Sequence, residues 1–380
     1  MDLELQRIAS VERIERTDWN ALSGGNPFLR HEFLVALERT GCVGPGSGWE
    51  PAFVAARAAG RLVGALPLYV KYDSRGEFVF DWSWADAYES AGGRYYPKLV
   101  AAIPFTPATG RRLLVAADAP RRQIEDALLA EAEAIRQELG ASSLHCLFPT
   151  DAEREAFESA GYLARKSCQF HWHNRGYADF DEFLGTFSSE KRKKARRERR
   201  RVGEAGIRFE QARGDELSVE DWDAVYDFHA RTFLRRGRPP YLNREFFAEV
   251  ARTMPEDIVI MLARYERTPI AAAICFRGGG ALYGRYWGSL ADFHSLHFEA
   301  CYYQGIEYCI REGLEKFEPG TQGEHKISRG FTPTATWSWH SLEDPRFRRA
   351  VQQFLTRETM QVDAYIDYLE DHVPYRREAR

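Results

Sequence analysis

The chain has 380 residues, of which 44% are hydrophobic and 28% charged, and a formal net charge of −4 at pH 7. This length favours two or three domains, and the composition excludes a disordered or fibrous chain. The nearly balanced charge excludes a polycation, so binding of nucleic acid or phosphate would require a local basic patch.

The six cysteines lie far apart and form no Cys-x-x-Cys pair, which is typical of buried thiols in a reducing compartment. The N-terminus lacks the basic and then apolar pattern of a signal peptide, and no apolar run approaches the length of a membrane span. We therefore expect a cytoplasmic protein without a transmembrane segment. The spacing of His294 and His297 is poor for a metal site, and no bound metal is expected.

The first half of the chain is expected to alternate helices and strands. Phe53 to Val70 should form a hairpin that turns at Ala59-Gly60, and Pro120 to Leu139 a helix that stops at Gly140. Phe78 to Tyr88 is rich in aromatic residues with interleaved carboxylates. Further helices are expected over residues 17–39 and 151–160, and strands over residues 99–103, 143–148 and 168–172.

Parts of this half recur later in the chain. Ala56-Arg57 and Val63-Gly64-Ala65 reappear 207 residues later as Ala263-Arg264 and Ile270-Ala271-Ala272. Two upstream segments are echoed in the same order, Trp19-Asn20-Ala21-Leu22 by Trp222-Asp223-Ala224-Val225, and Phe28-Leu29-x-x-Glu32-Phe33 by Tyr241-Leu242-x-x-Glu245-Phe246. A duplicated unit explains three ordered matches, and the alternative is chance alignment of apolar residues.

The most charged segment joins the two copies. Nine of the twelve residues from Glu190 to Arg201 are basic, and Ser188 or Ser189 could cap a helix there. Such a helix is basic on every side, without an apolar face. It is either a solvated linker or the binding site of a polyanion that relieves the repulsion between like charges.

The second copy contains three apolar runs, Ile258–Ala263, Ile270–Phe276 and Ala281–Trp287, separated by Pro- and Gly-containing turns. These runs predict an antiparallel meander. A helix from Leu296 to Leu314, a strand at Phe317 and a polar loop should follow. Meander, helix, strand and loop is the order in which GNAT-type acyltransferases build their donor cleft. The C-terminal segment from Pro345 to Asp371 reads as a packing helix.

Several motifs resemble the Fem-like predicted N-acyltransferases of peptidoglycan biosynthesis and recognition. They are Phe180–Leu184 leading to Ser189-x-Lys191-Arg192, Pro104–Pro107, Phe298-Glu299-x-x-Tyr302-Tyr303, and Phe317–Gly320 through Gly323–Ile327 to Arg329–Phe331. The resemblance covers nearly the whole chain. It implies an α+β fold of two tandem GNAT-like domains, each a mixed and mostly antiparallel sheet flanked by helices. We expect domains at 1–178 and 207–380, joined by a basic helical junction at 179–206.

Acylation of an amine needs a held donor, a deprotonated amine and stabilisation of the oxyanion. Glu299, in an apolar helix, is either a base with a raised pKa or a carboxylate paired with a cation. Glu324, His325 and Lys326 crowd one Gly-flanked loop and are the other catalytic candidates. The alternative for this loop is that its polar groups cap neighbouring backbone. Candidate substrate-binding residues are Asp81, Asp86, Tyr88, Thr106, Tyr302, Tyr303, Arg329 and His340. For Asp81, Asp86 and Tyr88, an aromatic core is the alternative reading.

The sequence leaves the donor open. Arg200-x-x-Gly203-x-Ala205 matches the pyrophosphate-loop motif of coenzyme A enzymes in its residues but is expected to follow a helix rather than open one. Arg285-x-x-Gly288-x-Leu290 lies between the third strand and the next helix, but Leu290 breaks the motif. Aminoacyl-tRNA, the donor that the resemblance implies, could be held by the basic helix. Candidate anion-binding residues are Lys191, Arg192, Arg196 and Arg285.

The sequence thus predicts an N-acyltransferase acting on an amine acceptor, for which a cell-wall precursor is one candidate. Its co-substrate would be aminoacyl-tRNA or acyl-CoA, with no permanently bound cofactor, and transient contact with a membrane surface is possible. The alternatives are an acyl-CoA-dependent GNAT enzyme acting on a small amine, and a non-catalytic module that binds an anionic precursor or RNA.

Overall fold

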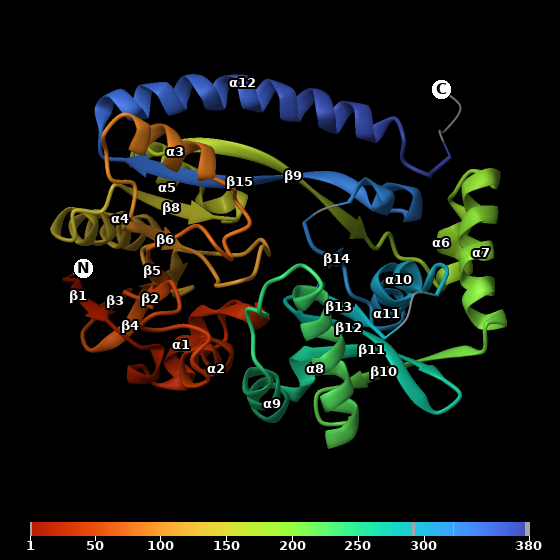
Figure 1. Cartoon of the computed structure of the whole chain (residues 1–380). Helices are drawn as coiled ribbons and strands as arrows, with labels where there is room; N and C mark the ends of the chain where they lie inside the picture. The colour runs from red at the N-terminus through yellow and green to blue at the C-terminus, as the bar shows by residue number, and fades with distance from the viewer. Residues whose placement is uncertain (1, 291–292, 322, 377–380) are drawn as a thin grey trace. The chain divides into compact units, whose positions relative to one another are not determined.

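The computed structural model describes residues 2–290, 293–321 and 323–376 (Figure 1). The chain folds into two compact units. Unit 1 consists of Met1–Ser167 with Ala335–Asp363, and unit 2 of Cys168–Thr334 with Ala364–Arg380. No helix in the described ranges combines the length and the apolarity needed to cross a bilayer.

These bounds differ from the expected division at residues 178 and 206. The boundaries lie inside two long strands, β9 (Leu163–His173) and β15 (Thr332–Leu342). The C-terminal helix α12 (Pro345–Glu370) contributes to both units, because Val351 and Leu355 pack in the core of unit 1 and Leu369 packs in that of unit 2.

Unit 1 contains two sheet segments. One is antiparallel, in the order β1 (Glu4–Ile8), β3 (Phe53–Ala58), β4 (Arg61–Leu66) and β7 (Leu114–Val115). The other joins β2 (Trp49–Pro51), β5 (Leu68–Lys71), β6 (Lys98–Ala101), β8 (Ser143–Leu147) and the second half of β15, with β6 and β8 parallel. The flanking helices are α1 (Arg16–Leu22), α2 (His31–Arg39), α3 (Trp82–Ser90), α4 (Arg121–Glu138) and α5 (Arg154–Ser159).

Unit 2 contains the predicted meander. The antiparallel strands are β10 (Ile207–Arg213), β11 (Ile258–Tyr265), β12 (Thr268–Gly278) and β13 (Ala281–Ser289), and β13 then pairs in parallel with the short β14 (Lys316–Glu318). The helices are α6 (Phe180–Gly185), α7 (Ser189–Glu204), α8 (Val219–Leu234), α9 (Arg244–Thr253), α10 (Leu296–Phe298) and α11 (Gln304–Arg311), with a π-helix η5 (Glu299–Tyr303) and a 3₁₀-helix η6 (Glu324–Arg329).

The hairpins β3–β4 and β11–β12 share the details that the repeat predicts. Each has a bulge at the repeated dipeptide, between Ala56 and Arg57 in one unit and between Ala263 and Arg264 in the other. Each also turns through a non-glycine residue with positive φ at the same offset, Ala59 (φ 49°) and Glu266 (φ 55°). Matching bulges and turns are expected of two copies of one ancestral unit.

Helix α7 differs from its expected form, because it has a buried face. Ala195, Glu198 and Val202 lie on one side of the helix at spacings of three and four residues and are buried. Two small apolar side chains and one carboxylate are enough to seat the helix, while its basic residues occupy the remaining circumference.

Helix α8 packs directly on β13, where Figure 1 shows it in green. A Cβ atom at Gly288 would lie 1.8 Å from the carbonyl oxygen of Phe228, so this approach requires glycine. His229 of α8 is buried with its ring centroid 4.6 Å from that of Tyr286 and 5.2 Å from that of Phe247.

Burial of His229 should make the protein sensitive to acid. Desolvation lowers the pKa of His229 to about 4, whereas an unfolded histidine titrates near 6.5. Between these values only the unfolded chain binds the proton, so stability falls as the pH falls from about 6.5 towards 4. We expect His229→Phe to recover about 2 kcal/mol at pH 5 relative to pH 7.5, measured by urea unfolding at both pH values. An unchanged pH dependence in the variant would contradict this.

Candidate active site

The parallel pairing of β13 and β14 is short, and a pocket opens where it ends. Only three residue pairs are formed, the last between Tyr283 and Glu318. Beyond them lies a pocket of about 100 Å³, which we call the notch. A Cβ atom at Gly284 would lie 3.3 Å from Cα of Pro319, so glycine permits the close approach of the strands at the notch floor. The lining residues are Ala273, Cys275, Gly284, Arg285, Tyr286, Trp287, His297, Cys301, Tyr302 and Pro319.

A bulge in β13 brings Arg285 to the notch. Ile274 pairs with Tyr286 but Cys275 pairs with Gly284, which leaves Arg285 as the extra residue of the bulge. Bulges redirect a side chain out of the regular alternation. Burial lowers the pKa of Arg285 from its ordinary value, and its guanidinium lies 5.4 Å from the ring centroid of Tyr286.

The opposite wall comes from an irregular helix. The predicted helix from Leu296 to Leu314 is present, but its middle, η5, is a π-helix, and it ends at Arg311. A π-turn changes the directions in which the side chains point, and such turns occur often at functional sites. Cys301 and Tyr302 line the notch from η5, and His297 lines it from α10. Burial lowers the pKa of His297 to about 4 and raises that of Tyr302 above its ordinary value.

The polar loop of the sequence forms η6, between Gly323 (φ 113°) and Gly330 (φ 98°). Exposed His325 lies with its Nε2 2.8 Å from the hydroxyl of Tyr302, which joins this loop to the notch. Burial and then Arg329 and Lys326 lower the pKa of His325 below its usual 6.5. The third loop candidate, Glu324, accepts a hydrogen bond from Tyr365 and is exposed.

Lys326 differs from its neighbours because it is buried, with 2% of its surface exposed. Its Nζ donates to the carbonyl of Gly320 at 2.6 Å and lies 5.8 Å from the ring centroid of Phe170. Desolvation lowers its pKa to about 7, and Cys301 of the notch opposes this weakly. A buried amine that is half protonated near neutral pH is typical of a functional site.

Helix α7 is attached to η5 and η6 by two ion networks, of which the first is buried and the second partly exposed. In the first, Glu198 accepts two hydrogen bonds from Arg329, at 2.8 and 3.1 Å, and one from the hydroxyl of Tyr303 at 2.6 Å. The guanidinium of Arg329 lies 3.4 Å above the ring centroid of Phe298. This network fixes Arg329, which in turn donates to the carbonyl of His325.

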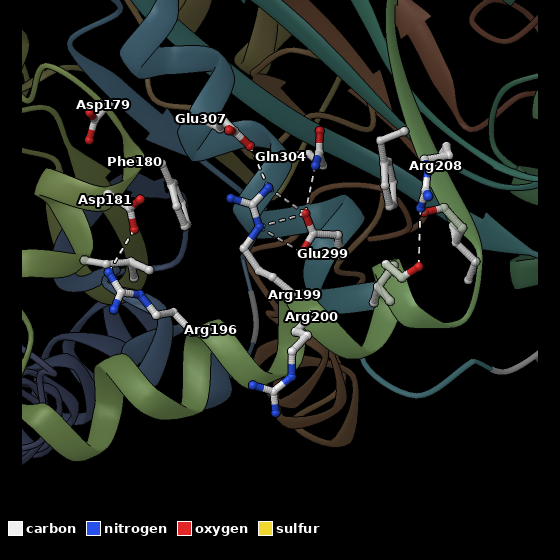
Figure 2. Close-up of a pocket in the computed structure, with 15 residues that line it drawn as sticks. Asp179, Phe180, Asp181, Arg196, Arg199, Arg200, Arg208, Glu299, Gln304 and Glu307 are labelled. Carbon is white, nitrogen blue, oxygen red and sulfur yellow. Dashed lines mark hydrogen bonds and ion pairs between the residues drawn. The ribbon is translucent and has the colours of Figure 1, made fainter.

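The second network contains Glu299 (Figure 2). Arg199 donates to Glu299 at 3.1 and 3.2 Å and to Glu307 at 2.6 Å, and Gln304 donates to Glu299 at 2.7 Å. Of the two readings of Glu299, this geometry matches the paired carboxylate. The network borders a surface pocket of about 690 Å³ that α6, α7 and β10 also line.

The outer part of α7 carries a cluster of five cations, which we call the α7 cluster. Within the described residues none of them forms an ion pair, and they are Lys191, Arg192, Lys193, Lys194 and Arg197. Arg196, also predicted to bind anions, instead pairs with Asp181 at 3.0 Å. Local repulsion among five unpaired cations favours an anionic ligand.

The substrate-binding candidates of unit 1 make other contacts. Asp81 is buried and accepts from Tyr95 and from the fully buried Lys98, which also pairs with Glu77, and it lies in a different unit from the notch. Buried His340 shares a short Nδ1–Nδ1 contact of 2.6 Å with His145. Three further candidates are placed as follows: Asp86 is exposed on α3, the ring centroid of Tyr88 lies 4.7 Å from that of Phe347, and Thr106 donates to the carbonyl of Pro104. Their role in acceptor binding stays a prediction.

Of the sequence candidates, Arg285 and Tyr302 therefore line the notch. His325 reaches it through its hydrogen bond to Tyr302, and Lys326 through the carbonyl of Gly320, which follows the lining residue Pro319. Tyr303 and Arg329 support this arrangement through Glu198. His297, Cys301, Glu198 and Arg199 were not among the sequence candidates. Glu198 could have been noticed as the one carboxylate inside the basic run from Lys191 to Arg201. Among the described residues, no group of three or more His, Cys, Asp or Glu side chains could hold a metal ion.

A family model described as peptidoglycan biosynthesis/recognition, FemAB-like, matches residues 10–377. A search of curated proteins finds no match. Among solved structures, the chain is similar to FemX, with a TM-score of 0.56 and 12% identity over 92% of this chain and 100% of that chain. It is also similar to L-PGS from Bacillus licheniformis, with a TM-score of 0.53 and 12% identity over 90% of this chain and 96% of that chain.

A tandem GNAT protein from the clavulanic acid biosynthesis pathway aligns with a TM-score of 0.47 and 15% identity over 90% of this chain and 99% of that chain. At these identities the similarities concern the fold alone. The predicted fold, α+β with two GNAT-like units of mostly antiparallel sheet, is confirmed.

Proposed function

The chain belongs to the FemAB-like family of peptidoglycan biosynthesis and recognition, and on this basis we propose that it is an N-acyltransferase whose active site is the notch of unit 2. The observation that carries the proposal is the meeting of three features at one strand end. They are an open pocket, the pair of Tyr302 and His325, and buried Lys326. The family description favours a peptidoglycan precursor as the amine acceptor.

Unit 1 supports this choice by contrast. Its parallel pair, β6–β8, corresponds to β13–β14, but the end of β8 is occupied by Arg112, which is fully buried. Arg112 donates to the carbonyls of Leu147, Gly110 and Ala108, each at 2.8 Å. A guanidinium whose donors are satisfied by its own loop and by the last residue of β8 leaves no place there for an acyl group. We therefore place the reaction in unit 2.

The reaction proceeds by attack of an amine nitrogen on the acyl carbonyl of the donor. The new C–N bond forms as the bond to the leaving oxygen or sulfur breaks. The amine proton passes to a base, which returns it to the leaving hydroxyl or thiol. His325 takes this role in the proposal, because its lowered pKa keeps it neutral at pH 7 and Tyr302 orients its ring. Protonated Lys326 stabilises the oxyanion, since a buried cation acts strongly in a site of low polarity.

Aminoacyl-tRNA is the proposed donor, held by the α7 cluster, with Arg285 contacting the acyl end of the donor at the notch. The support is the five cations without ion pairs on the helix whose Glu198 and Arg199 bind η5. The alternative donor is acyl-CoA, and the activity assay distinguishes it from aminoacyl-tRNA.

We expect tRNA binding to depend steeply on salt. If the five cations of the α7 cluster contact phosphates, the plot of log K against log salt has a slope of about −4. Lys193→Gln and Lys194→Gln should each reduce the magnitude of the slope by about 1, measured by fluorescence anisotropy with labelled tRNA. Arg252→Gln, which changes an arginine paired with Glu249, is the matched control and should leave the slope unchanged. A slope near zero for the wild-type protein would exclude binding of tRNA by the α7 cluster.

Activity is tested by mixing the protein with charged tRNA or acetyl-CoA and amine-bearing muropeptides, and detecting the amide by mass spectrometry. Product formed only with charged tRNA supports the proposal. Product formed with acetyl-CoA, together with stabilisation of the fold by coenzyme A, supports the acyl-CoA alternative. No product with either donor, but tight binding of tRNA or precursor, would identify a non-catalytic binding module.

A further inference from the structure

The last turn of α8 and the segment that follows it carry a second group of unpaired cations. Arg231, Arg235, Arg236 and Arg238 lie within eight residues, all are exposed, and none forms an ion pair within the described part of the chain. The net charge of the whole chain is −4, so the positive charge is concentrated locally. We call these four side chains the arginine turn.

The helix dipole alone does not account for the arginine turn. Cations are stabilised at a helix C-terminus, which explains Arg231 in the last turn of α8. The helix ends at Leu234, however, and Arg236 and Arg238 lie beyond it, around Gly237 (φ 69°). The dipole effect falls off within one turn, so it does not account for these two arginines.

An exposed apolar residue lies among the four charges. The surface of Leu234 is 62% exposed, which is among the highest values for a large hydrophobic residue in this protein. Leu234 is flanked in the sequence by Arg231, Arg235 and Arg236 and followed by Pro239 and Pro240, so an exposed apolar residue and exposed cations share one short segment. Such a segment matches the interface of a lipid bilayer, where acyl chains lie beneath phosphate head groups.

The arginine turn and the α7 cluster lie on opposite faces of the sheet of unit 2. Tyr286 contacts His229 of α8 and pairs across the sheet with Ile274, so Ile274 points to the α8 side. The neighbours of Ile274 on β12, Ala273 and Cys275, pack in the same core as Ala300 of η5. Since neighbouring residues of a strand point to opposite faces, α8 and η5 cover opposite sides. The α7 cluster is attached on the η5 side, so one ligand of ordinary size would not explain both groups.

We propose that the arginine turn docks unit 2 on an anionic lipid surface, with Leu234 inserted between phosphate head groups. The turn is close to the notch, because Thr232, one helical turn before Arg235 and Arg236, donates at 2.7 Å to the carbonyl of Trp287, which lines the notch. Docking there would hold the active site near an acceptor carried by the membrane. The docking itself does not depend on the acyl-transfer chemistry, so it can hold or fail separately.

The test is binding of the full chain to vesicles, measured by co-sedimentation. We expect binding to vesicles that contain phosphatidylglycerol and none to vesicles of phosphatidylcholine alone, with affinity falling as salt rises. Each arginine near an anionic surface contributes about fivefold, so replacing all four arginines with glutamine should weaken binding more than about a hundredfold. Leu234→Ser should weaken it without changing the charge.

The matched control replaces Lys191, Arg192, Lys193 and Lys194 with glutamine, which removes the same charge from the opposite face. This variant should keep vesicle binding within about threefold. Equal loss in both quadruple variants, or no binding of the wild type to anionic vesicles, would overturn the proposal. If soluble pyrophosphate abolished vesicle binding completely, the arginine turn would be assigned to a soluble diphosphate ligand. If the quadruple variant of the arginine turn lost tRNA binding but kept vesicle binding, the turn would be assigned to RNA.

Discussion

Replacement of Lys326 with methionine is expected to lower kcat by about 10²–10³-fold, the effect of removing one oxyanion donor from an active site. Methionine keeps the length and apolar body of the side chain, so the buried position stays filled. The measurement is single-turnover transfer from aminoacyl-tRNA, the proposed donor. A rate within about threefold of the wild type would remove Lys326 from the mechanism.

The pH dependence of the same reaction provides a second test. His325 must be neutral, so activity should rise through its pKa, which lies below 6.5. Lys326 must be protonated, so activity should fall again above its pKa of about 7. The wild-type profile is therefore bell-shaped with a maximum close to neutral pH. Lys326→Met should keep the acidic limb and lose the alkaline one, and His325→Ala should do the reverse.

Lys316→Met is the control for a lysine change in the same unit. Lys316 pairs with Glu318 on β14 and is only partly buried, and it has no hydrogen bond to the η6 loop among its described contacts. Its replacement should leave both limbs of the pH profile in place. Loss of the alkaline limb in Lys316→Met would mean that Lys326 is not the group that titrates.

Replacement of Glu198 with alanine is expected to lower the free energy of unfolding by about 3–5 kcal/mol, more than any other substitution proposed for this protein. The reason is that it leaves the guanidinium of Arg329 buried without a carboxylate. The side chains of Arg329 and Glu198 are 3% and 8% exposed, and Tyr303 also loses its acceptor. Urea unfolding measures the loss. Glu307→Gln is the control, since Glu307 is 41% exposed and Arg199 keeps Glu299, and it should cost at most about 1 kcal/mol.

A double variant separates stability from activity. Glu198→Leu combined with Arg329→Met removes both charges together, and replacing a buried pair with apolar residues of similar volume is often neutral. The stability should return to within about 2 kcal/mol of the wild type. The rate of acyl transfer should remain low, because methionine in place of Arg329 cannot donate a hydrogen bond to the carbonyl of His325. Recovery of both stability and activity would show that the network serves the fold alone.

The elements of the fold were largely predictable because short-range chemistry encodes them. Turns at Ala59-Gly60 and before Pro269, alternation of apolar runs and the stop at Gly140 all depend on neighbouring residues, and the corresponding hairpins and helices are present. The repeat at 207 residues was visible for the same reason, since the bulge after Ala56 and that after Ala263 follow the same local sequence.

The composition of the candidate site depended on tertiary structure. Glu198 meets Arg329 across 131 residues and Arg199 meets Glu299 across 100 residues, and no local pattern encodes which cation will reach which carboxylate. The π-turn that brings Tyr302 to His325, and the burial that lowers the pKa of Lys326, likewise arise only when distant segments pack. The sequence by itself determined the repeated framework and the chemical types available to the site, whereas packing decided which of them meet, because desolvation and ion pairing depend on position in space.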